Sequence, residues 1–226
     1  MITFNNVSKK YGDNEVVKEA SFKIGPGEFI SLVGKSGAGK STLIKMLIGE
    51  ERPSKGRVIF GRYEVNKLNH HELPELRRHM GIVFQDYRLL SKKTAYENVV
   101  FAMEVAGRPN KEIENVVPQV LDLVGLGSKM NNYVHELSGG EKQRTAIARA
   151  MVNHPDVIIA DEPTGNLDPI NTWGIINLLV KINELGTTVI LATHNRDIVN
   201  QLEKRVISME DGRIIQDEEK GKYILV

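Results

Sequence analysis

The chain has 226 residues, and its 30 Lys and Arg against 29 Asp and Glu leave a formal net charge of +1. With 41% hydrophobic and 26% charged residues, the composition is that of a globular protein and excludes disorder as the dominant state. The near-neutral charge argues against a dedicated nucleic-acid binder. The lack of cysteine excludes disulfides, a thiolate nucleophile and zinc sites built on Cys. The first residues lack a signal-peptide pattern and no apolar run has membrane-spanning length, so we expect neither feature.

The first part of the chain predicts strands, a glycine-rich loop and a helix. Apolar alternation over 2–4 and 20–24, with turn signals between and after these stretches, predicts short antiparallel strands. A buried strand is expected over 29–33, and helical character runs from Thr42 to Leu47. Strand, glycine loop and helix are therefore expected in that order.

The rest of the chain alternates helical and strand patterns. From about residue 86 to residue 137 the pattern is helical, although Pro118 lies inside the apolar stripe over 113–124 and argues against one straight helix. The expected elements that follow are a strand over 155–161, a helix over 169–184, a strand over 188–193 and a hairpin around Asp211-Gly212. Strands that alternate with helices predict an α/β fold with a mostly parallel sheet, covered on both faces.

A phosphate-binding loop is predicted directly after the strand over 29–33. Residues 34–41 fit the pattern G-x-x-x-x-G-K-[ST], between a predicted strand and a predicted helix. Glycines let backbone N–H groups point inward at a helix N-terminus, which favours anions. We expect Lys40 to reach the outer phosphates and Ser41 to supply a hydroxyl to Mg²⁺. The residues expected to bind nucleotide are Gly34, Lys35, Ser36, Gly37, Ala38, Gly39, Lys40, Ser41 and Thr42.

An acidic pair, Asp161 and Glu162, ends the second buried strand. Because consecutive strand residues point in different directions, the two carboxylates can serve different roles. We expect Asp161 to orient the magnesium shell and Glu162 to face the attacking water, as general base or water-positioning group. A guanine-specific motif is excluded, because its nearest match, residues 66–69, lacks the carboxylate that would pair with the base.

A second glycine motif, Ser138-Gly139-Gly140-Glu141, precedes a helical stretch and has two interpretations. A Ser followed three residues later by Glu is a capping box that needs no ligand, and for the motif alone we favour this interpretation. The alternative is a second anion site at a helix N-terminus.

These motifs together resemble the ATP-binding-cassette (ABC) ATPases. The resemblance rests on the phosphate loop, Leu137–Glu141, Asp161-Glu162 and His194 in this order and spacing, and it extends over essentially the whole chain. Residues 161–168 are similar to the cassettes for lipoprotein release and macrolide efflux. The stretches 81–90 and 94–102 are most similar to the cassettes of bacterial cell division.

The resemblance implies a single cassette over residues 1–226. Its P-loop NTPase core, with an antiparallel β-subdomain, would comprise residues 1–85 and 155–226. A helical subdomain over about 86–154 would be inserted into this core and would carry the motif Leu137–Glu141.

The resemblance also assigns roles within one chain. Gln85 matches a lid glutamine that binds Mg²⁺ or water. His194 matches a switch histidine that contacts the γ-phosphate and holds the attacking water. Tyr11 matches an aromatic residue that stacks on adenine, although it could be a turn tyrosine without a ligand. Lys35 stands where related division cassettes often have proline, and we expect only its backbone to face phosphate.

Other roles require a second copy of the chain. In an ATP-bound homodimer, the motif residues Ser138, Gly139 and Gly140 of one copy would cover the γ-phosphate held by the other. Asp168 would line the dimer seam and couple the two nucleotide sites.

The implied function is Mg²⁺-dependent hydrolysis of ATP to drive an FtsX-like integral membrane subunit that regulates cell-wall hydrolases during division. This partner would dock near Gln85–Leu90 and would hold the cassette at the cytoplasmic face of the membrane, although Leu89 and Leu90 could equally be ordinary subdomain core. Three alternatives stay open: the ATPase of a lipoprotein-release or macrolide-type exporter, a soluble cassette protein, and a catalytically idle binding cassette. We expect no nucleic-acid partner.

Overall fold

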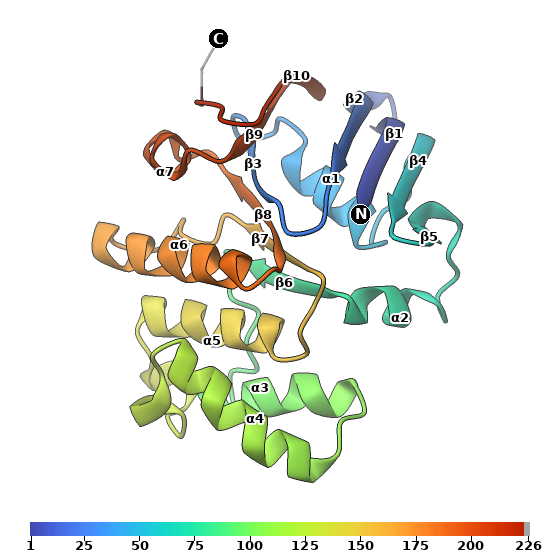
Figure 1. Cartoon of the computed structure of the whole chain (residues 1–226). Coiled ribbons are helices and arrows are strands. Elements are labelled where there is room, and N and C mark those ends of the chain that lie inside the picture. The colour runs from blue at the N-terminus through green and yellow to red at the C-terminus, as the bar shows by residue number, and fades with distance from the viewer. Residues whose placement is uncertain (224–226) are drawn as a thin grey trace. The chain divides into compact units, whose positions relative to one another are not determined.

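The computed structural model describes residues 1–223, which fall into two compact units (Figure 1). The first unit comprises Met1–Arg77 and the segment from Thr188 onward, and the second comprises Arg78–Thr187. The division into a core and a helical subdomain at about residues 86 and 154 stays a prediction. Within residues 1–223, every helix is too short or too polar to cross a bilayer.

An antiparallel sheet occupies the first part of the first unit, in the order β2-β1-β4-β5. Its strands are β1 (Ile2–Tyr11), β2 (Asn14–Ile24), β4 (Lys55–Phe60) and β5 (Tyr63–Glu64). The antiparallel prediction is confirmed, but β1 and β2 span 10 and 11 residues and are not short. Asn6 and Glu19 have φ angles of 49° and 53°, and the bulges they mark interrupt the alternation on which the predicted limits depended.

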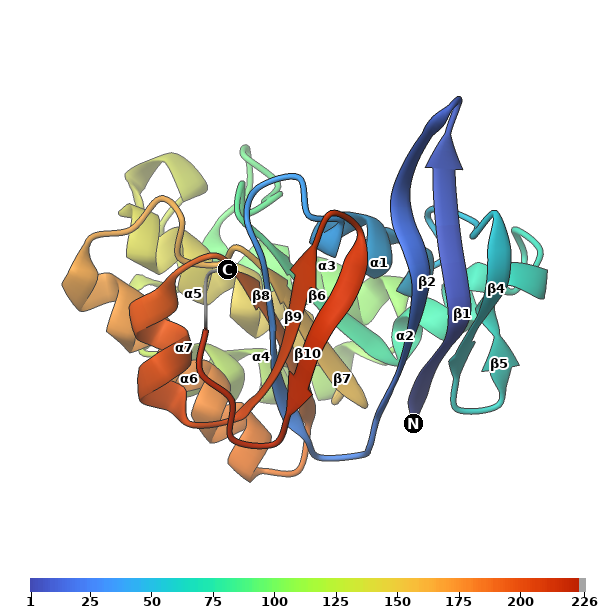
Figure 2. The ribbon, with the colours of Figure 1, turned by 90° about the horizontal axis from the view of Figure 1, so that it is seen from above.

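A second group of strands in this unit follows the order β10-β9-β3-β8 (Figure 2). These strands are β3 (Phe29–Val33), β8 (Thr188–Thr193), β9 (Arg205–Glu210) and β10 (Arg213–Glu218). Strand β3 pairs in parallel with both β8 and β9, and every residue of β3 and β8 is buried. Continuous burial explains why both strands are apolar runs with predictable limits. The predicted hairpin is confirmed, since Asp211 and Gly212 both have positive φ, as its tight turn requires.

The helices of the first unit are short, and one further helix straddles the boundary. The short helices are α1 (Lys40–Leu47), the 3₁₀ turn Val65–Lys67 and α7 (Arg196–Leu202). The helix that crosses the boundary is α2 (Leu73–Arg78), whose last residue belongs to the second unit.

The second unit combines two parallel strands with four longer helices. Its elements are β6 (Met80–Phe84), α3 (Ala95–Val105), α4 (Asn110–Leu123), α5 (Gly139–Met151), β7 (Val157–Asp161) and α6 (Pro169–Glu184). Two 3₁₀ turns, Gly127–Lys129 and Val134–Glu136, lie between α4 and α5. The parallel strands and their helices confirm the α/β class.

The helical pattern expected from about residue 86 is wrong for residues 86–94. Tyr87 and Arg88 have positive φ, which a helix does not accommodate. Helix α3 begins only after Thr94, whose side chain forms a capping box with Glu97. The apolar stripe over 113–124 belongs mostly to one helix, because α4 continues through Pro118. The carbonyl that loses its donor belongs to Glu114, which is exposed and can bind water.

Candidate functional site

The predicted phosphate loop connects β3 to α1 in the first unit. Gly37 and Gly39 have φ angles of 83° and 105°, a region that glycine enters without steric cost. A Cβ at Gly39 would stand 2.9 Å from the carbonyl oxygen of Val16. The loop therefore needs glycine at Gly39 both for its backbone conformation and for the close approach of β2.

Lys40 is buried inside the curl of this loop. Its Nζ donates hydrogen bonds to the carbonyl oxygens of Gly34, at 2.7 Å, and Lys35, at 3.3 Å. Ser41 is exposed and Thr42 is half-buried in the first turn of α1. The N-cap of α1 is Gly39, and within residues 1–223 no side chain caps this helix start. The loop thus gathers an ammonium group, a hydroxyl and an uncapped helix start, which together suit a phosphate ligand.

Strand register brings His194 to the same edge as the phosphate loop. Val33 of β3 is opposite Thr193 of the parallel strand β8, so the loop and His194 leave neighbouring strands at their carboxyl ends. Asn195 caps α7, accepting hydrogen bonds from backbone amides through Oδ1, and its own amide donates to Thr193 Oγ1 at 3.1 Å. The exposed His194 is therefore held between a strand end and a helix cap.

Tyr11 lies at the end of β1, and 43% of its surface is exposed. The Nζ of Lys9 lies 4.9 Å from the centre of its ring and also pairs with Glu51 at 2.6 Å. The ring thus lies at the tip of the β1–β2 hairpin, whose second strand approaches the phosphate loop at Gly39. An exposed aromatic face is what stacking on a base requires.

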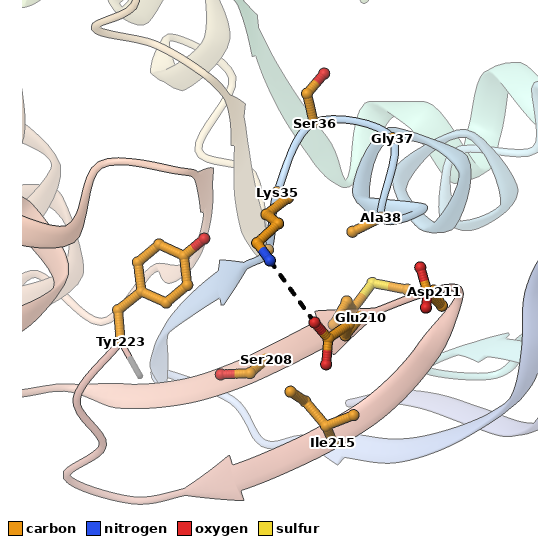
Figure 3. A pocket seen from close by; sticks show the side chains of 11 residues that line it. Lys35, Ser36, Gly37, Ala38, Ser208, Glu210, Asp211, Ile215 and Tyr223 are labelled. Atoms are coloured by element: carbon orange, nitrogen blue, oxygen red, sulfur yellow. Dashed lines mark ion pairs between the residues drawn. The ribbon is translucent and has the colours of Figure 1, made fainter. Parts of the chain in front are cut away.

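A cavity of about 370 Å³ lies beside the phosphate loop (Figure 3). It is lined by Gly34, Lys35, Ser36, Gly37, Ala38, Ser208, Met209, Glu210, Asp211, Ile215 and Tyr223. The Lys35 side chain points toward Glu210 of β9, with 3.9 Å between the charged groups. This direction is compatible with a purely backbone contribution of Lys35 to phosphate binding.

In the second unit, strand register brings Gln85 beside the acidic pair. Phe84 of β6 is opposite Asp161 of the parallel strand β7, so Gln85 and Glu162 follow neighbouring strand ends. Glu162 has a φ of 50°, a left-handed conformation that turns the chain sharply at this carboxylate. A Cβ at Gly165 would stand 2.8 Å from Gln85 Nε2. The loop after Glu162 therefore packs directly on the Gln85 amide.

Ser138 is the N-cap of α5, and the predicted capping box is confirmed. Its amide donates to Glu141 Oε2 at 2.9 Å, and its Oγ accepts from the Glu141 amide at 3.4 Å. Lys129 Nζ lies 2.6 Å from the other carboxylate oxygen of Glu141. The hydrogen bond from Lys129, followed by that from the Ser138 amide, lowers the pKa of Glu141 below its ordinary value.

Gly139 and Gly140 allow two side chains to approach the start of α5. A Cβ at Gly139 would stand 3.2 Å from the Tyr87 hydroxyl, and one at Gly140 would clash with the amide of Asn171. The side-chain amide of Asn171 in turn donates to Oδ2 of Asp168, the N-cap of α6. The backbone amide of Asn171 also donates to Asp168, to Oδ1 at 3.0 Å. These hydrogen bonds, the side chain of Asn171 foremost, lower the pKa of Asp168.

Of the predicted Mg²⁺ ligands, Ser41 of the first unit supplies a hydroxyl, and Asp161 and Gln85 of the second unit supply a carboxylate and an amide oxygen. Within residues 1–223, no three His, Cys, Asp or Glu side chains group closely enough to hold a metal ion alone. Mg²⁺ commonly takes one or two protein carboxylates and completes its shell with water and substrate phosphates. The donor chemistry therefore fits magnesium bound together with a nucleotide.

The predicted site residues are divided between the units. Tyr11, residues 34–42 and His194 belong to the first unit. Those in the second unit are Gln85, Ser138, Gly139, Gly140, Asp161, Glu162 and Asp168. Sequence reasoning missed Asn166, Asn171 and Arg149, which contact these residues or the backbone close to them, and it named Tyr87 only for docking of a partner. Of these, only Asn171 carried a local signal, three residues after a predicted N-cap.

Comparison with known proteins gives a consistent result. Residues 17–165 match the family model described as ABC transporter. The chain is 52% identical over 224 residues to the cell division ATP-binding protein FtsE of Streptococcus pneumoniae strain D39, covering 99% of this chain and 97% of that protein. FtsE of Bacillus subtilis strain 168 is 50% identical, with coverage of 99% and 98%.

A solved structure is also similar to this chain. It is a dimeric ATP-binding cassette in a post-hydrolysis state bound to ADP and Pi, with a TM-score of 0.87 and 33% identity. The match covers 99% of this chain and 100% of that one.

Proposed function

The chain belongs to the ABC transporter family and is an ATPase of the FtsE cell-division type, and from this premise we propose how its residues hydrolyse ATP and what the hydrolysis drives. The proposal assigns Mg²⁺-ATP as substrate and an integral membrane protein as the driven partner. It also assigns a role to each of the predicted site residues.

The phosphate loop is proposed to hold the β- and γ-phosphates through its backbone amides. Lys40 would turn its ammonium group from the carbonyls of Gly34 and Lys35 toward the phosphate oxygens, since charge-assisted hydrogen bonds are the stronger ones. His194 would contact the γ-phosphate, and Tyr11 would stack on adenine. In this arrangement the loop supplies the donors that stabilise charge on the transferred phosphoryl group.

Glu162 is proposed to orient and activate the attacking water, with Gln85 as its neighbour. The left-handed backbone at Glu162 sets the direction in which its side chain leaves the main chain, and a water-positioning group requires a defined placement. Mg²⁺, held by Ser41, Asp161 and Gln85, would neutralise charge on the phosphate oxygens when bound. Water attack in line with the leaving ADP oxygen then yields ADP and phosphate.

The α5 start is proposed to act on the nucleotide of a second copy. Ser138, Gly139 and Gly140 would cover the γ-phosphate bound by the partner, with the positive end of the helix dipole toward the anion. Asp168 would line the seam between the copies. In support, a solved relative of this chain is a dimer bound to ADP and Pi.

The single observation that carries the hydrolytic proposal is the burial of Lys40 within the phosphate loop. The glycines of this loop have left-handed backbone conformations, and within the described residues the helix that follows it starts without a side-chain cap. The test is Glu162→Gln, with Glu184→Gln on the exposed end of α6 as control. We expect ATP binding to persist while turnover falls about 10²-fold or more, because only the water-directing carboxylate is lost. Wild-type turnover in Glu162→Gln would exclude the assignment.

We also propose that closure of the dimer works on an FtsX-like membrane subunit in cell division, regulates cell-wall hydrolases through it, and is held at the cytoplasmic face of the membrane by it. The docking surface would be Gln85–Leu90, where Leu90 is 37% exposed and Tyr87 is half-buried. The test is capture of the detergent-solubilised complex and identification of the bound chain by mass. A four-span division protein supports the proposal, whereas a permease with a periplasmic adaptor indicates an exporter.

A further inference from the structure

The segment Gln85–Leu90, which joins β6 to the region before α3, has a strained backbone. Tyr87 and Arg88 have φ angles of 61° and 46°, so two consecutive residues with side chains occupy the left-handed region. Such conformations cost free energy and persist only when neighbouring groups hold them in place. The contacts that hold this segment therefore decide where Gln85 lies.

Arg149 of α5 holds the strained peptide units directly. One guanidinium nitrogen donates to the carbonyl of Tyr87 at 3.0 Å, and the other donates to the carbonyl of Arg88. The planar fork of arginine matches two consecutive carbonyls in a way that the single ammonium of lysine does not. Burial lowers the pKa of Arg149, so this charge is taken out of water to make these two bonds.

Both ends of the segment are fixed by side chains from other elements. Asn98 of α3 is fully buried, accepts from the Leu90 amide at 2.7 Å and donates to the Leu90 carbonyl at 3.3 Å. Asn166 donates to the Gln85 carbonyl at 3.2 Å. Arg149 thus holds the middle of a segment whose two ends are already anchored.

Tyr87 also meets the beginning of the helix that carries Arg149. A Cβ at Gly139 would stand 3.2 Å from the Tyr87 hydroxyl, while the Tyr87 carbonyl accepts from Arg149 ten residues further along α5. Tyr87 is therefore in contact with α5 at two levels. A helix transmits displacement along its axis as a rigid body, so a shift at the start of α5 must reach the segment through both contacts.

We infer that Arg149 is a positioning residue: its guanidinium fixes the strained Tyr87–Arg88 backbone and so makes the position of Gln85 follow the start of α5. The inference rests on the proposed roles of Gln85 and Ser138, and it adds the connection between them. A displacement of the Ser138 motif then changes the position of the Gln85 amide without any contact of Arg149 with nucleotide.

The experiment compares Arg149→Met and Arg149→Lys in the full chain, captured with its membrane partner. The matched control is Arg144→Met on the same helix, because the Arg144 guanidinium also donates to a backbone carbonyl, that of Val124 at 3.2 Å. Amide hydrogen exchange over residues 85–90 reports the backbone, and ATP turnover reports the reaction.

For Arg149→Met we expect about tenfold faster exchange over residues 85–90 and about tenfold lower kcat, with the KM for ATP changed less than about twofold. Arg149→Lys should recover part of both losses, since its ammonium can still reach one carbonyl. Arg144→Met should leave exchange in this segment at the wild-type rate. Partial recovery by lysine is a response that a general packing defect would not give.

Unchanged exchange over residues 85–90 in Arg149→Met would overturn the inference, whatever the turnover. Faster exchange with unchanged kcat would also overturn it, because the contact would then hold the backbone without serving the reaction. If the wild-type complex hydrolyses no ATP, the proposed function fails, whereas the exchange result still decides whether Arg149 holds the segment. If Arg149→Met does not fold, the comparison of Arg149→Lys with wild type applies the same criteria.

Discussion

Helices α1 and α5 are both proposed to meet phosphate at their N-termini, but their first turns are built in opposite ways. The N-cap of α1 is Gly39, in a left-handed conformation, and the first turn, Lys40-Ser41-Thr42, contains no acidic residue. The N-cap of α5 is Ser138, which forms a reciprocal capping box with Glu141, and Lys129 supports that carboxylate. One helix start lacks a cap of its own, and the other has one.

The difference in capping decides how stable each helix start is when no ligand is bound. Side-chain groups satisfy two backbone amides at the start of α5, so this start is stabilised before any phosphate binds. The α1 start gains most from an anion, because within residues 1–223 no side chain caps its amides and its first turn has no acidic residue. We therefore expect α1 to provide the affinity for ATP and α5 to provide a preformed surface for it.

Of the effects expected at these two helix starts, the largest is that of Lys40→Ala on nucleotide binding. Charge-assisted hydrogen bonds contribute about 1.5–3 kcal/mol each, so loss of the ammonium should weaken ATP binding about 10²-fold. Equilibrium titration of the purified chain with ATP measures this change. Lys45→Ala, at an exposed position later in the same helix, is the matched control and should keep wild-type affinity. Equal losses in both variants would mean that total charge, not the loop, determines binding.

An intermediate effect is expected for Ser138→Ala, which removes the cap of α5. Loss of a serine cap costs about 1 kcal/mol of stability, measured by urea denaturation. ATP turnover should fall about tenfold or more, because the surface proposed to cover the partner's phosphate is disturbed. Binding of ATP to a single copy should be unchanged.

Thr94→Ala is the control for Ser138→Ala. Thr94 forms the same capping box at α3, where Glu97 takes the place of Glu141, so its loss should cost similar stability. Turnover in Thr94→Ala should stay within about twofold of wild type. If both variants lose turnover equally, the Ser138 motif has only the capping role, and the comparison between α1 and α5 loses its functional meaning.

Elements with strong local signals were predictable from the sequence. The limits of β3, α6 and β8 agree with prediction, because buried parallel strands are continuous apolar runs and α6 is marked at both ends. Asp168 caps it, Pro169 opens it, and Gly186, with a φ of 99°, follows its end. The phosphate loop was likewise predictable, since its pattern is contiguous.

Contacts between distant residues were not predictable in this way. The segment 86–94 carries apolar residues at helical spacing, yet Arg149, 62 residues after Tyr87, holds its backbone in another conformation. Position 140 requires glycine because a Cβ there would clash with Asn171, and nothing near Gly140 in the sequence indicates that neighbour. A single sequence reveals residue types and local periodicity, but not which remote side chain overrides a local preference.

The smallest expected effect concerns acid pH and the two capping boxes. Hydrogen bonds from Lys129 and Lys93 are the largest causes that lower the pKa values of Glu141 and Glu97. A carboxyl whose pKa is lower when folded stabilises the protein above its unfolded pKa of about 4.3, and loses this contribution as the pH falls through the folded value. Wild type should therefore be more stable than Glu141→Gln or Glu97→Gln at pH 6, and this advantage should shrink as the pH falls below about 4.

Urea denaturation of wild type, Glu141→Gln and Glu97→Gln at pH 6 and at pH 3 measures the change in unfolding free energy. Both pairs are at or near the surface, so added salt should reduce the difference at pH 6. The α1 start has no first-turn acid and offers no such titration. Similar acid responses at Glu141 and Glu97 would show that α5 begins as an ordinary capped helix. An advantage over Glu141→Gln that persists unchanged at pH 3 would mean that hydrogen bonding by a neutral side chain, rather than carboxylate charge, holds the start of α5.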